Sequence, residues 1–301
     1  MYLITASART LALGRISQYV VDLLARQGGP VRALVRLDDA FADGLRERGA
    51  EVVVGDLRNP ADVVTAMRDV TRAFFNTSIS MDYLQKTALV CAAARERGDL
   101  EVVVNMSSMT VSQMTLTSTQ ESGQQRLHWL GEQIMNWSGI PVAHVRPTVF
   151  LDNPLFTVCA RRSVRDRDVL ALPFGTGRTS PIAASDVARV VATLMVNPPQ
   201  DGGQVYGLTG PQVLDIKDLA EQYSRALGRS ISAEDIPYDD WVLEYLRPSG
   251  LSDLDQQHLA AVALLHRENR YDRSTHDVEQ LTGQPPQTVE HYIASHPELF
   301  A

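Results

Sequence analysis

Short apolar runs rich in β-branched residues alternate with longer segments of helical periodicity through the first half of the chain. The runs are Tyr2–Thr5, Val31–Val35, Glu51–Val54, Arg72–Asn76, Glu101–Met106 and Val142–Arg146. Each lies between polar or turn residues, as strands buried on both faces do. Ile16–Arg26 and Tyr83–Glu96 carry apolar residues at helical spacing. Because right-handed crossovers place helices on both faces of such a sheet, we expect an α/β fold with a doubly wound parallel sheet.

After about residue 150 the alternation gives way to shorter elements separated by Pro and Gly. Two helices are still indicated by their first residues, one starting at Ser185 and Asp186 and one at Asp215, with Asp218 three residues later. The length of 301 residues allows one large domain or two small ones, at roughly 150 residues each. We expect a second domain to pack tightly on the first and to share its cleft, which is the default binding site.

The composition excludes several classes of function. With 28 Lys+Arg against 36 Asp+Glu the formal charge is -8, which opposes binding to nucleic acid or to an anionic membrane surface. No apolar stretch approaches the roughly 20 residues that span a bilayer. Cys91 and Cys159 are too few for a disulfide framework, and the first strand starts where a leader peptide would lie. We therefore expect a cytoplasmic protein with a small-molecule substrate, and a homodimer is left open.

The segment from Thr5 to Ser17 follows the first strand and opens a helix, where dinucleotide-binding proteins carry a glycine-rich fingerprint. Gly14 can stand for the third glycine, Ala6 occupies the first position, and the middle glycine has no counterpart. Ala6 would cost about 1 kcal/mol or more if the turn required a positive φ, whereas Arg9 and Arg15 bring positive charge. We expect weakened or altered cofactor binding with contacts from Thr5, Ser7, Gly14, Arg15 and Ile16. The alternative is a vestigial loop packed on itself.

Arg36 ends the second strand, where an NAD enzyme usually offers an acidic group to the ribose 2′-hydroxyl. An arginine can pair with the 2′-phosphate of NADP instead, so this residue favours NADP(H) as the cofactor. A surface arginine near Asp38 and Asp39 is the alternative.

Ligands of parallel sheets bind outside the carboxyl ends of the strands. The fourth strand ends at Asn76, Thr77 and Ser78, and the fifth at Ser107 and Ser108. We expect the first three and Ser107 to contact the cofactor and Ser108 to contact the substrate. Plain turns are the alternative.

Phe150 and Asn153 follow the sixth strand, and Phe174 precedes the Gly175–Gly177 turn. We expect these residues to line a substrate pocket, with core packing of both aromatic rings as the alternative. No metal site is expected, because the histidines lack Cys or carboxylate partners at a ligand spacing. The Arg161–Asp168 stretch mixes arginines with acids and is typical of a solvated helix face.

An ordered set of stretches resembles the NmrA-like family of atypical short-chain dehydrogenases over almost the whole chain. The stretches are Val31–Arg36, Gly55–Leu57, His128 with Glu132, Ser138–Ile140, Arg146–Phe150 with Asn153, Asp186–Arg189 and Val205–Pro211. The tail, from Gly250 through Pro285, is similar to bacterial NADPH-dependent quinone-oxidoreductase-like members.

This resemblance implies a Rossmann-like, NAD(P)-binding domain at 1–150 that takes NADP(H). It also implies a smaller C-terminal subdomain at 151–301 on the substrate side, with about 181–206 packing back on the sheet. Asp56 and Leu57 would then lie beside the adenine.

Typical short-chain dehydrogenases use Tyr-x-x-x-Lys, in which the lysine lowers the tyrosine pKa for proton transfer. Counting back from Glu132, the lysine position holds His128 and the tyrosine position holds Gln124, which is neither acid nor base. The resemblance places His128 on the nicotinamide side of the cleft, where it is the candidate catalytic residue. The alternative is a structural histidine that bonds a neighbouring carbonyl.

Three functions are compatible with these residues. The first is an NAD(P)H-dependent oxidoreductase that reduces a small quinone-like or conjugated carbonyl acceptor, because reduced quinone oxygens are stabilised as phenolates and need little acid catalysis. The second is a non-catalytic NADP(H)-sensing regulator that binds a protein partner, which the missing Tyr and Lys suggest. The third is a scaffold for redox-neutral chemistry, as in a cyclase or dehydratase, which the altered glycine loop suggests.

Overall fold

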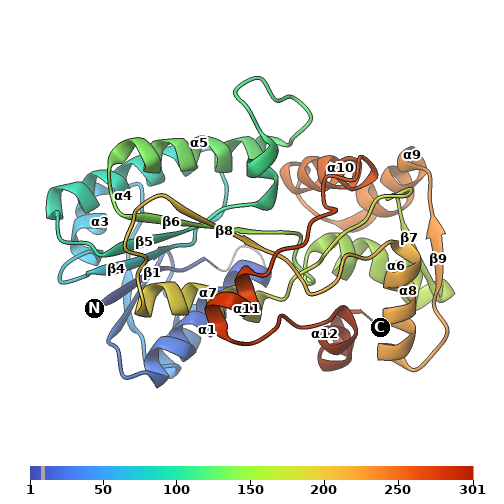
Figure 1. Ribbon diagram of the computed structural model, residues 1–301, viewed down its shortest axis with the longest axis horizontal. Helices are drawn as coiled ribbons and strands as arrows, with labels where there is room; N and C mark the ends of the chain where they lie inside the picture. The colour runs from blue at the N-terminus through green and yellow to red at the C-terminus, as the bar shows by residue number, and fades with distance from the viewer. Residues whose placement is uncertain (8–10, 301) are drawn as a thin grey trace.

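Seven parallel strands form the main sheet in the order β3-β2-β1-β4-β5-β6-β8. The computed structural model describes residues 1–7 and 11–300 (Figure 1). The strands are β1 (Tyr2–Thr5), β2 (Val31–Val35), β3 (Glu51–Val54), β4 (Arg72–Phe75), β5 (Val102–Met106), β6 (Val142–Pro147) and β8 (Gln204–Leu208). The first six lie within one residue of the predicted runs, and the predicted doubly wound parallel sheet is confirmed.

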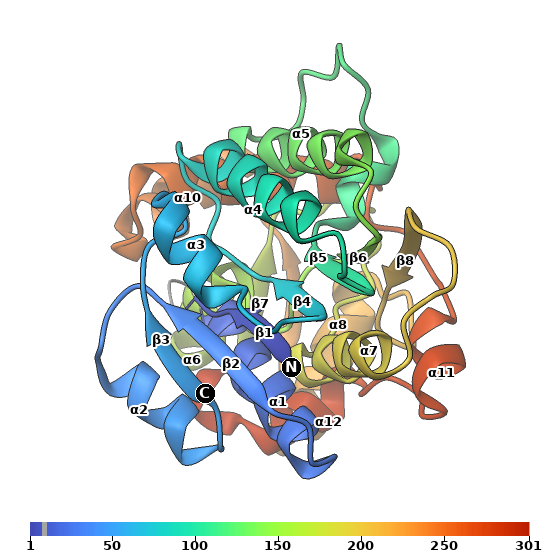
Figure 2. The same ribbon diagram turned by 90° about the vertical axis from the view of Figure 1, so that its left-hand side faces the viewer.

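Helices cover both faces of this sheet (Figure 2). One face carries α1 (Leu11–Arg26), α2 (Ala40–Glu47) and α7 (Ala184–Val196), and the other carries α3 (Pro60–Ala66), α4 (Tyr83–Arg97) and α5 (Gly123–Ser138). The apolar helix faces form one core with each side of the sheet, through residues such as Ile16 and Val187 on one side and Val90 and Met135 on the other. Burial of these faces, rather than helix propensity, stabilises the layers.

Two details differ from the sequence analysis. The run Glu51–Val54 was expected to be buried on both faces, but β3 is the edge strand and Val54 is 50% exposed. The helix expected at Ser185 starts at Ala184 and has no side-chain cap, because its N-cap residue, Ala183, has no polar side chain. The Asp215 prediction is confirmed: its carboxylate caps α8 (Ile216–Leu227) in a capping box with Asp218.

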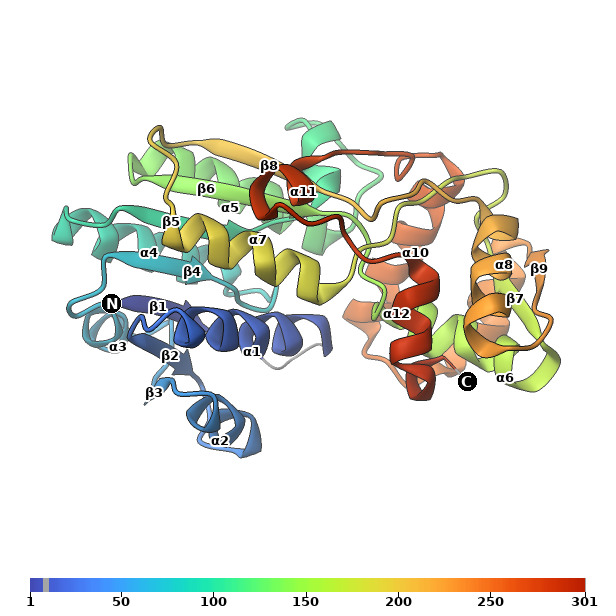
Figure 3. The same cartoon turned by 60° about the horizontal axis from the view of Figure 1, so that its bottom comes forward.

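The second half of the chain builds a separate core around a two-stranded parallel sheet, β7 (Val169–Leu172) with β9 (Ser232–Asp235). The other elements of this half are η2 (Leu155–Ala160), α6 (Arg161–Arg167), α9 (Tyr238–Trp241), η3 (Val242–Leu246), η4 (Arg247–Ser249), α10 (Asp253–Arg267), α11 (Asp277–Thr282), α12 (Val289–Ser295) and η5 (Pro297–Leu299). In the first half, the short helix η1 (Met109–Gln113) follows β5. The chain returns to the main sheet twice. First α7 packs on α1 and β8 pairs with β6, and later α11 packs on α7 and β8 (Figure 3).

The strand order reverses between β1 and β4, because β2 and β3 extend the sheet to one side and β4 to β6 to the other. Such a reversal leaves a crevice at the carboxyl ends of the strands. The backbone N–H of Ala6 continues the ladder, donating to Leu34 O at 2.9 Å. Among the described residues, the non-glycine residues with positive φ are Asp69, Asp168 and Asn269, so the turn places no such strain on Ala6.

Candidate functional site

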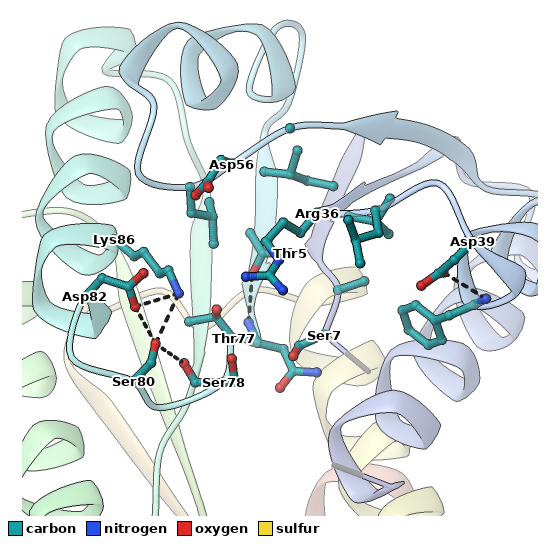
Figure 4. Close-up of a pocket in the computed structure, with 18 residues that line it drawn as sticks. Thr5, Ser7, Arg36, Asp39, Asp56, Thr77, Ser78, Ser80, Asp82 and Lys86 are labelled. Atoms are coloured by element: carbon teal, nitrogen blue, oxygen red, sulfur yellow. Dashed lines mark hydrogen bonds and ion pairs between the residues drawn. The ribbon is translucent and has the colours of Figure 1, made fainter. Parts of the chain in front are cut away.

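A cavity of about 440 Å³, the edge cavity, lies at the carboxyl ends of β1 to β4 (Figure 4). Eight of the predicted cofactor residues line it: Thr5, Ser7, Arg36, Asp56, Leu57, Asn76, Thr77 and Ser78. They come from four separate strand ends that are far apart in sequence but adjacent in the sheet. The sheet therefore gathers them at the switch point, where nucleotides bind in open α/β folds.

Other charged groups around the edge cavity already have partners. Lys86, which the sequence analysis missed, lies with its Nζ 2.9 Å from Asp82 Oδ1 at the start of α4. Arg58 lies 2.5 Å from Asp56, and its hydrogen bonds lower the pKa of that carboxyl to about 2. Sequence spacing could not have assigned Lys86 to this cavity, because only the packing of α4 brings it beside the sheet edge.

Arg36 is different, because it is exposed, points into the edge cavity (Figure 4), and has no ion pair within residues 1–7 and 11–300. The two acids that could have paired with it are engaged elsewhere. Asp38 pairs with Arg46 at 2.6 Å, and Asp39 caps α2 by accepting from Phe41 N and Ala42 N. The guanidinium is therefore available to an anionic ligand, for which arginine has suitable donor geometry.

Asn76 connects the edge cavity to α1. Its side chain is fully buried, and its Nδ2 donates to Leu13 O at 3.1 Å and to Ser17 Oγ at 2.9 Å. Its backbone N–H donates to Thr5 Oγ1 at 2.9 Å. The remaining acceptor, Asn76 Oδ1, is buried and has no partner in the part of the chain that the structure describes. An unsatisfied buried acceptor costs free energy, so this oxygen suits a donor supplied by a ligand.

Four of the predicted cofactor residues do not line the edge cavity. Gly14, Arg15 and Ile16 lie within α1, where Ile16 is fully buried in the core and Arg15 Nη1 donates to Tyr292 Oη at 3.0 Å. Ser107 lines a second cavity described below. Arg9 lies outside the described residues. The cofactor contacts of these residues stay predictions.

Asp152 is a buried acid close to Arg15 and Tyr292. The residue is 2% exposed, and neither carboxylate oxygen has a hydrogen-bond partner within residues 1–7 and 11–300. Burial raises its pKa to about 6, although the charge of Arg15 acts in the opposite direction. A carboxyl with a raised pKa binds its proton more tightly when folded, so its contribution to stability is lost as the pH rises from about 4 to 6.

We expect Asp152→Asn to stabilise the protein by about 1–3 kcal/mol at pH 7, because the amide is never charged. The gain should shrink to near zero at pH 4, where the native acid is protonated. Urea unfolding of both proteins at several pH values checks this, and the difference between them removes the contribution of other titrating groups. Asp201→Asn, in an exposed loop, is the matched control. A gain that is independent of pH would contradict the assignment.

A second cavity of about 110 Å³, the histidine cavity, lies beyond the ends of β5 and β6 and takes its name from His128 and His258. Five predicted residues line it: Ser107, Ser108, His128, Phe150 and Asn153. Phe174 does not line it, because its ring is fully buried and stacks on His266, which in turn stacks on Tyr271. Phe174 thus lies behind the lining of the histidine cavity, and its contact with a substrate stays a prediction.

The side of the histidine cavity contributed by the second half of the chain comes from residues that the sequence analysis did not propose. These residues are His258, Val262 and Tyr271, from α10 and the segment after it. Gln125 Nε2 donates to Tyr271 Oη at 3.5 Å, so the phenol proton is free to donate to a ligand. The sequence spacing of these residues does not indicate a shared site, because α10 meets the start of α5 only in the folded chain.

Ser107 is attached to a buried ion pair behind the histidine cavity. Its Oγ donates to Glu132, which accepts from Arg146 Nε at 2.9 Å and Nη2 at 2.5 Å. Burial alone would raise the Glu132 pKa, but the hydrogen bonds and charge of Arg146 bring it below its usual range. Because the Ser107 proton is directed to an ionised carboxylate, the hydroxyl faces the cavity as an acceptor rather than a donor.

His128 and Gln124 lie one helical turn apart on α5, and both reach the histidine cavity. Burial lowers the pKa of His128 to about 4, so the imidazole is neutral at pH 7. Its ring packs edge-on against Tyr83, with centroids 5.7 Å apart, and its Nδ1 is buried without a partner. The neighbouring-carbonyl bond considered above is absent among the described residues.

Within residues 1–7 and 11–300, no three His, Cys, Asp or Glu side chains converge as a metal site would require. In that same part of the chain, no helix has the length and apolarity needed to cross a bilayer.

Comparisons with known proteins agree with this architecture. The chain is 29% identical over 297 residues to the NAD(P)H azoreductase of Xenophilus azovorans, covering 95% of this chain and 96% of that protein. The NADPH-dependent quinone oxidoreductase of Escherichia coli in complex with NADPH has a similar structure, with a TM-score of 0.82 and 22% identity. The match covers 99% of this chain and 100% of that chain. The structure of NmrA, a negative transcriptional regulator, in complex with NADP is also similar, with a TM-score of 0.77 and 17% identity. The match covers 97% of this chain and 94% of that chain.

The family comparison covers most of the chain, including the ends of strands β2 to β6, and begins after the end of β1. The profile of the NmrA-like family matches residues 10–293. The resemblance inferred from the sequence is confirmed, and this chain belongs to the NmrA-like family.

Proposed function

We propose that this chain is an NADPH-dependent reductase of a small quinone-like or conjugated acceptor. The observation that carries the proposal is a pair of cavities lined by neighbouring strand ends of one sheet, the first of which holds Arg36, a guanidinium with no ion pair among the described residues. The strand ends that line them are neighbours in the order β1, β4, β5, β6. A dinucleotide bound in the edge cavity would run along this row of strand ends and present its reactive end to the histidine cavity.

The residues of the edge cavity fit NADP(H). Arg36 offers an unpaired cation for the 2′-phosphate, and the buried Asn76 Oδ1 offers an acceptor for a ligand donor. Asp56 is ionised and Leu57 is apolar, which suits a hydroxyl or amino donor beside a flat ring. The bound cofactor would supply a hydride, so that NADPH, one proton and the quinone give NADP⁺ and the hydroquinone.

The chain's own residues would orient the acceptor and donate to its oxygens. Because a buried N–H without an acceptor is costlier than a bare lone pair, we assign the His128 proton to Nε2, opposite the unpartnered Nδ1. His128 then acts as a neutral donor, not as an imidazolium acid. The hydroxyl of Tyr271 offers a second hydrogen-bond donor, and the hydroxyl oxygen of Ser107 offers an acceptor. The proton that completes the hydroquinone comes from water.

The experiment is steady-state oxidation of NADPH, followed at 340 nm, with a panel of benzoquinones, naphthoquinones and conjugated enones. Turnover with at least one acceptor supports the proposal. Tight NADPH binding with no consumption across the panel contradicts it and favours the second candidate, a non-catalytic sensor. That candidate rests on Gln124 at the tyrosine position and on the low pKa of His128, because neither side chain is an acid that titrates near pH 7.

We expect His128→Leu to lower kcat by about tenfold, the effect of losing one hydrogen bond to the reduced oxygen. His128→Gln retains a side-chain N–H and should stay within threefold of the native value. The pH profile of kcat between 6 and 8 should not change with either variant, because the native imidazole does not titrate there. Stopped-flow reduction of 1,4-benzoquinone measures these rates. Equal rates for all three proteins would remove His128 from the site chemistry.

A further inference from the structure

The lining of the histidine cavity contains no formal charge. Of the described residues that form it, none is Lys, Arg, Asp or Glu. The groups it offers are hydroxyls, side-chain amides, two imidazoles and apolar surface, including Phe150 and Val262. The volume of about 110 Å³ is smaller than the cavity of about 150 Å³ that is known to bind benzene, so there is room for no more than one six-membered ring.

The imidazoles do not supply a cation. Burial lowers the pKa of His128 and of His258 to about 4 in each case. His258 Nδ1 lies 2.7 Å from Ser122 Oγ, which fixes its ring at the cavity wall. At neutral pH both rings can exchange hydrogen bonds with a ligand, but neither attracts an anion.

Two arginines near the lining are each held by a carboxylate. Arg146 is bound by Glu132 behind Ser107, and Arg270 is bound by Glu121 at 2.9 Å. Asp255, an acid on α10, accepts from Gln124 Nε2 at 3.3 Å and carries no positive charge to the lining. An anion in the cavity would lose its hydration without gaining a counter-charge, which is strongly unfavourable in a buried site.

The N-terminus of α5 borders the cavity but is closed by its own residues. Ser122 Oγ accepts from Gln125 N, and Gln125 Oε1 accepts from Ser122 N, so the capping box uses side-chain partners for these donors. The helix end therefore has fewer free N–H groups for an anion than an uncapped helix would have.

We propose, building on the reductase function above, that the histidine cavity accepts only an acceptor whose reacting ring is uncharged. Rings that carry a sulfonate, carboxylate or phosphate are excluded by the lack of a counter-charge. Substituents on a distant ring in solvent are not restricted in this way. The substrate class is thus a neutral, single-ring quinone or enone head group.

The test compares binding of 1,4-hydroquinone and hydroquinone-2-sulfonate to the full-length protein by ligand-observed NMR under anaerobic conditions. Titrations with and without saturating NADP⁺ test the cavity separately from the cofactor. We expect the neutral ligand to bind at least tenfold more tightly. Equal or tighter binding of the sulfonate, or no binding of either ligand, would overturn the inference. If the ligands separate as expected but no quinone consumes NADPH, the reductase function fails while the cavity assignment stands.

The variant Ser108→Lys tests whether the sulfonate is excluded by its charge rather than by its size. Ser108 is partly exposed on the cavity lining, and its hydroxyl contacts only Thr110 among the described side chains. We expect the lysine to raise the affinity for the sulfonate at least tenfold. Ser108→Met, of similar length, should leave the ratio between the two ligands unchanged. Failure of the lysine to raise sulfonate affinity in a protein that still binds hydroquinone would contradict exclusion by charge.

Discussion

Arg146→Met should lower the free energy of unfolding by about 3–5 kcal/mol at pH 7. Arg146 holds Glu132, whose side chain is 1% exposed, through two hydrogen bonds. Removing the guanidinium leaves an ionised carboxylate in the interior with only Ser107 as a donor. The penalty should be smaller at pH 5, because the unpaired carboxyl can then be protonated.

Urea unfolding of three variants separates the buried charge from lost packing. Glu132→Gln combined with Arg146→Met should recover most of the lost stability, since no charge remains buried. Arg165→Met is the exposed control, because Arg165 and Asp166 are about half exposed and such pairs contribute at most about 1 kcal/mol. A double variant as unstable as Arg146→Met alone would show that the buried charge is not the cause.

Arg36→Ala should weaken NADPH binding by about 1.5–3 kcal/mol, which is roughly 10- to 150-fold in Kd, and should leave NADH binding nearly unchanged. The selectivity follows because the two cofactors differ only in the 2′-phosphate, the group that we assign to the Arg36 guanidinium. Nicotinamide fluorescence during titration of each protein with each cofactor gives the four dissociation constants.

Arg58→Ala is the matched control for Arg36→Ala. Arg58 is half-exposed near the same cavity, but its guanidinium is bound by Asp56. Its loss should change the NADPH affinity by less than threefold. Equal losses for NADPH and NADH on removing Arg36, or a larger NADPH effect from Arg58, would show that the 2′-phosphate is held elsewhere.

The edge cavity was largely predictable from the sequence. Parallel strands share one carboxyl edge, so the residues after each strand converge whatever the loops between them contain. Arg36 and Asn76 could therefore be assigned from strand ends alone, and the structure places both in one cavity. Lys86 could not be assigned in this way, because it reaches the cavity from the side of a helix.

The histidine cavity was only half predictable. Ser107 and Phe150 follow strands, but His258 and Tyr271 depend on how α10 packs against α5. That packing is set by long-range contacts such as Ser122 with His258, which have no local periodicity. For the same reason the sequence could not show that Phe174 lies behind Tyr271 and His266 rather than at the surface of the cavity.

The most direct test of the whole account is the electron density of crystals grown with saturating NADPH. We expect density along the carboxyl ends of β1, β4 and β5, with the 2′-phosphate against Arg36 and the nicotinamide beside the histidine cavity. An empty edge cavity in those crystals, or a cofactor bound with its 2′-phosphate away from Arg36, would contradict it.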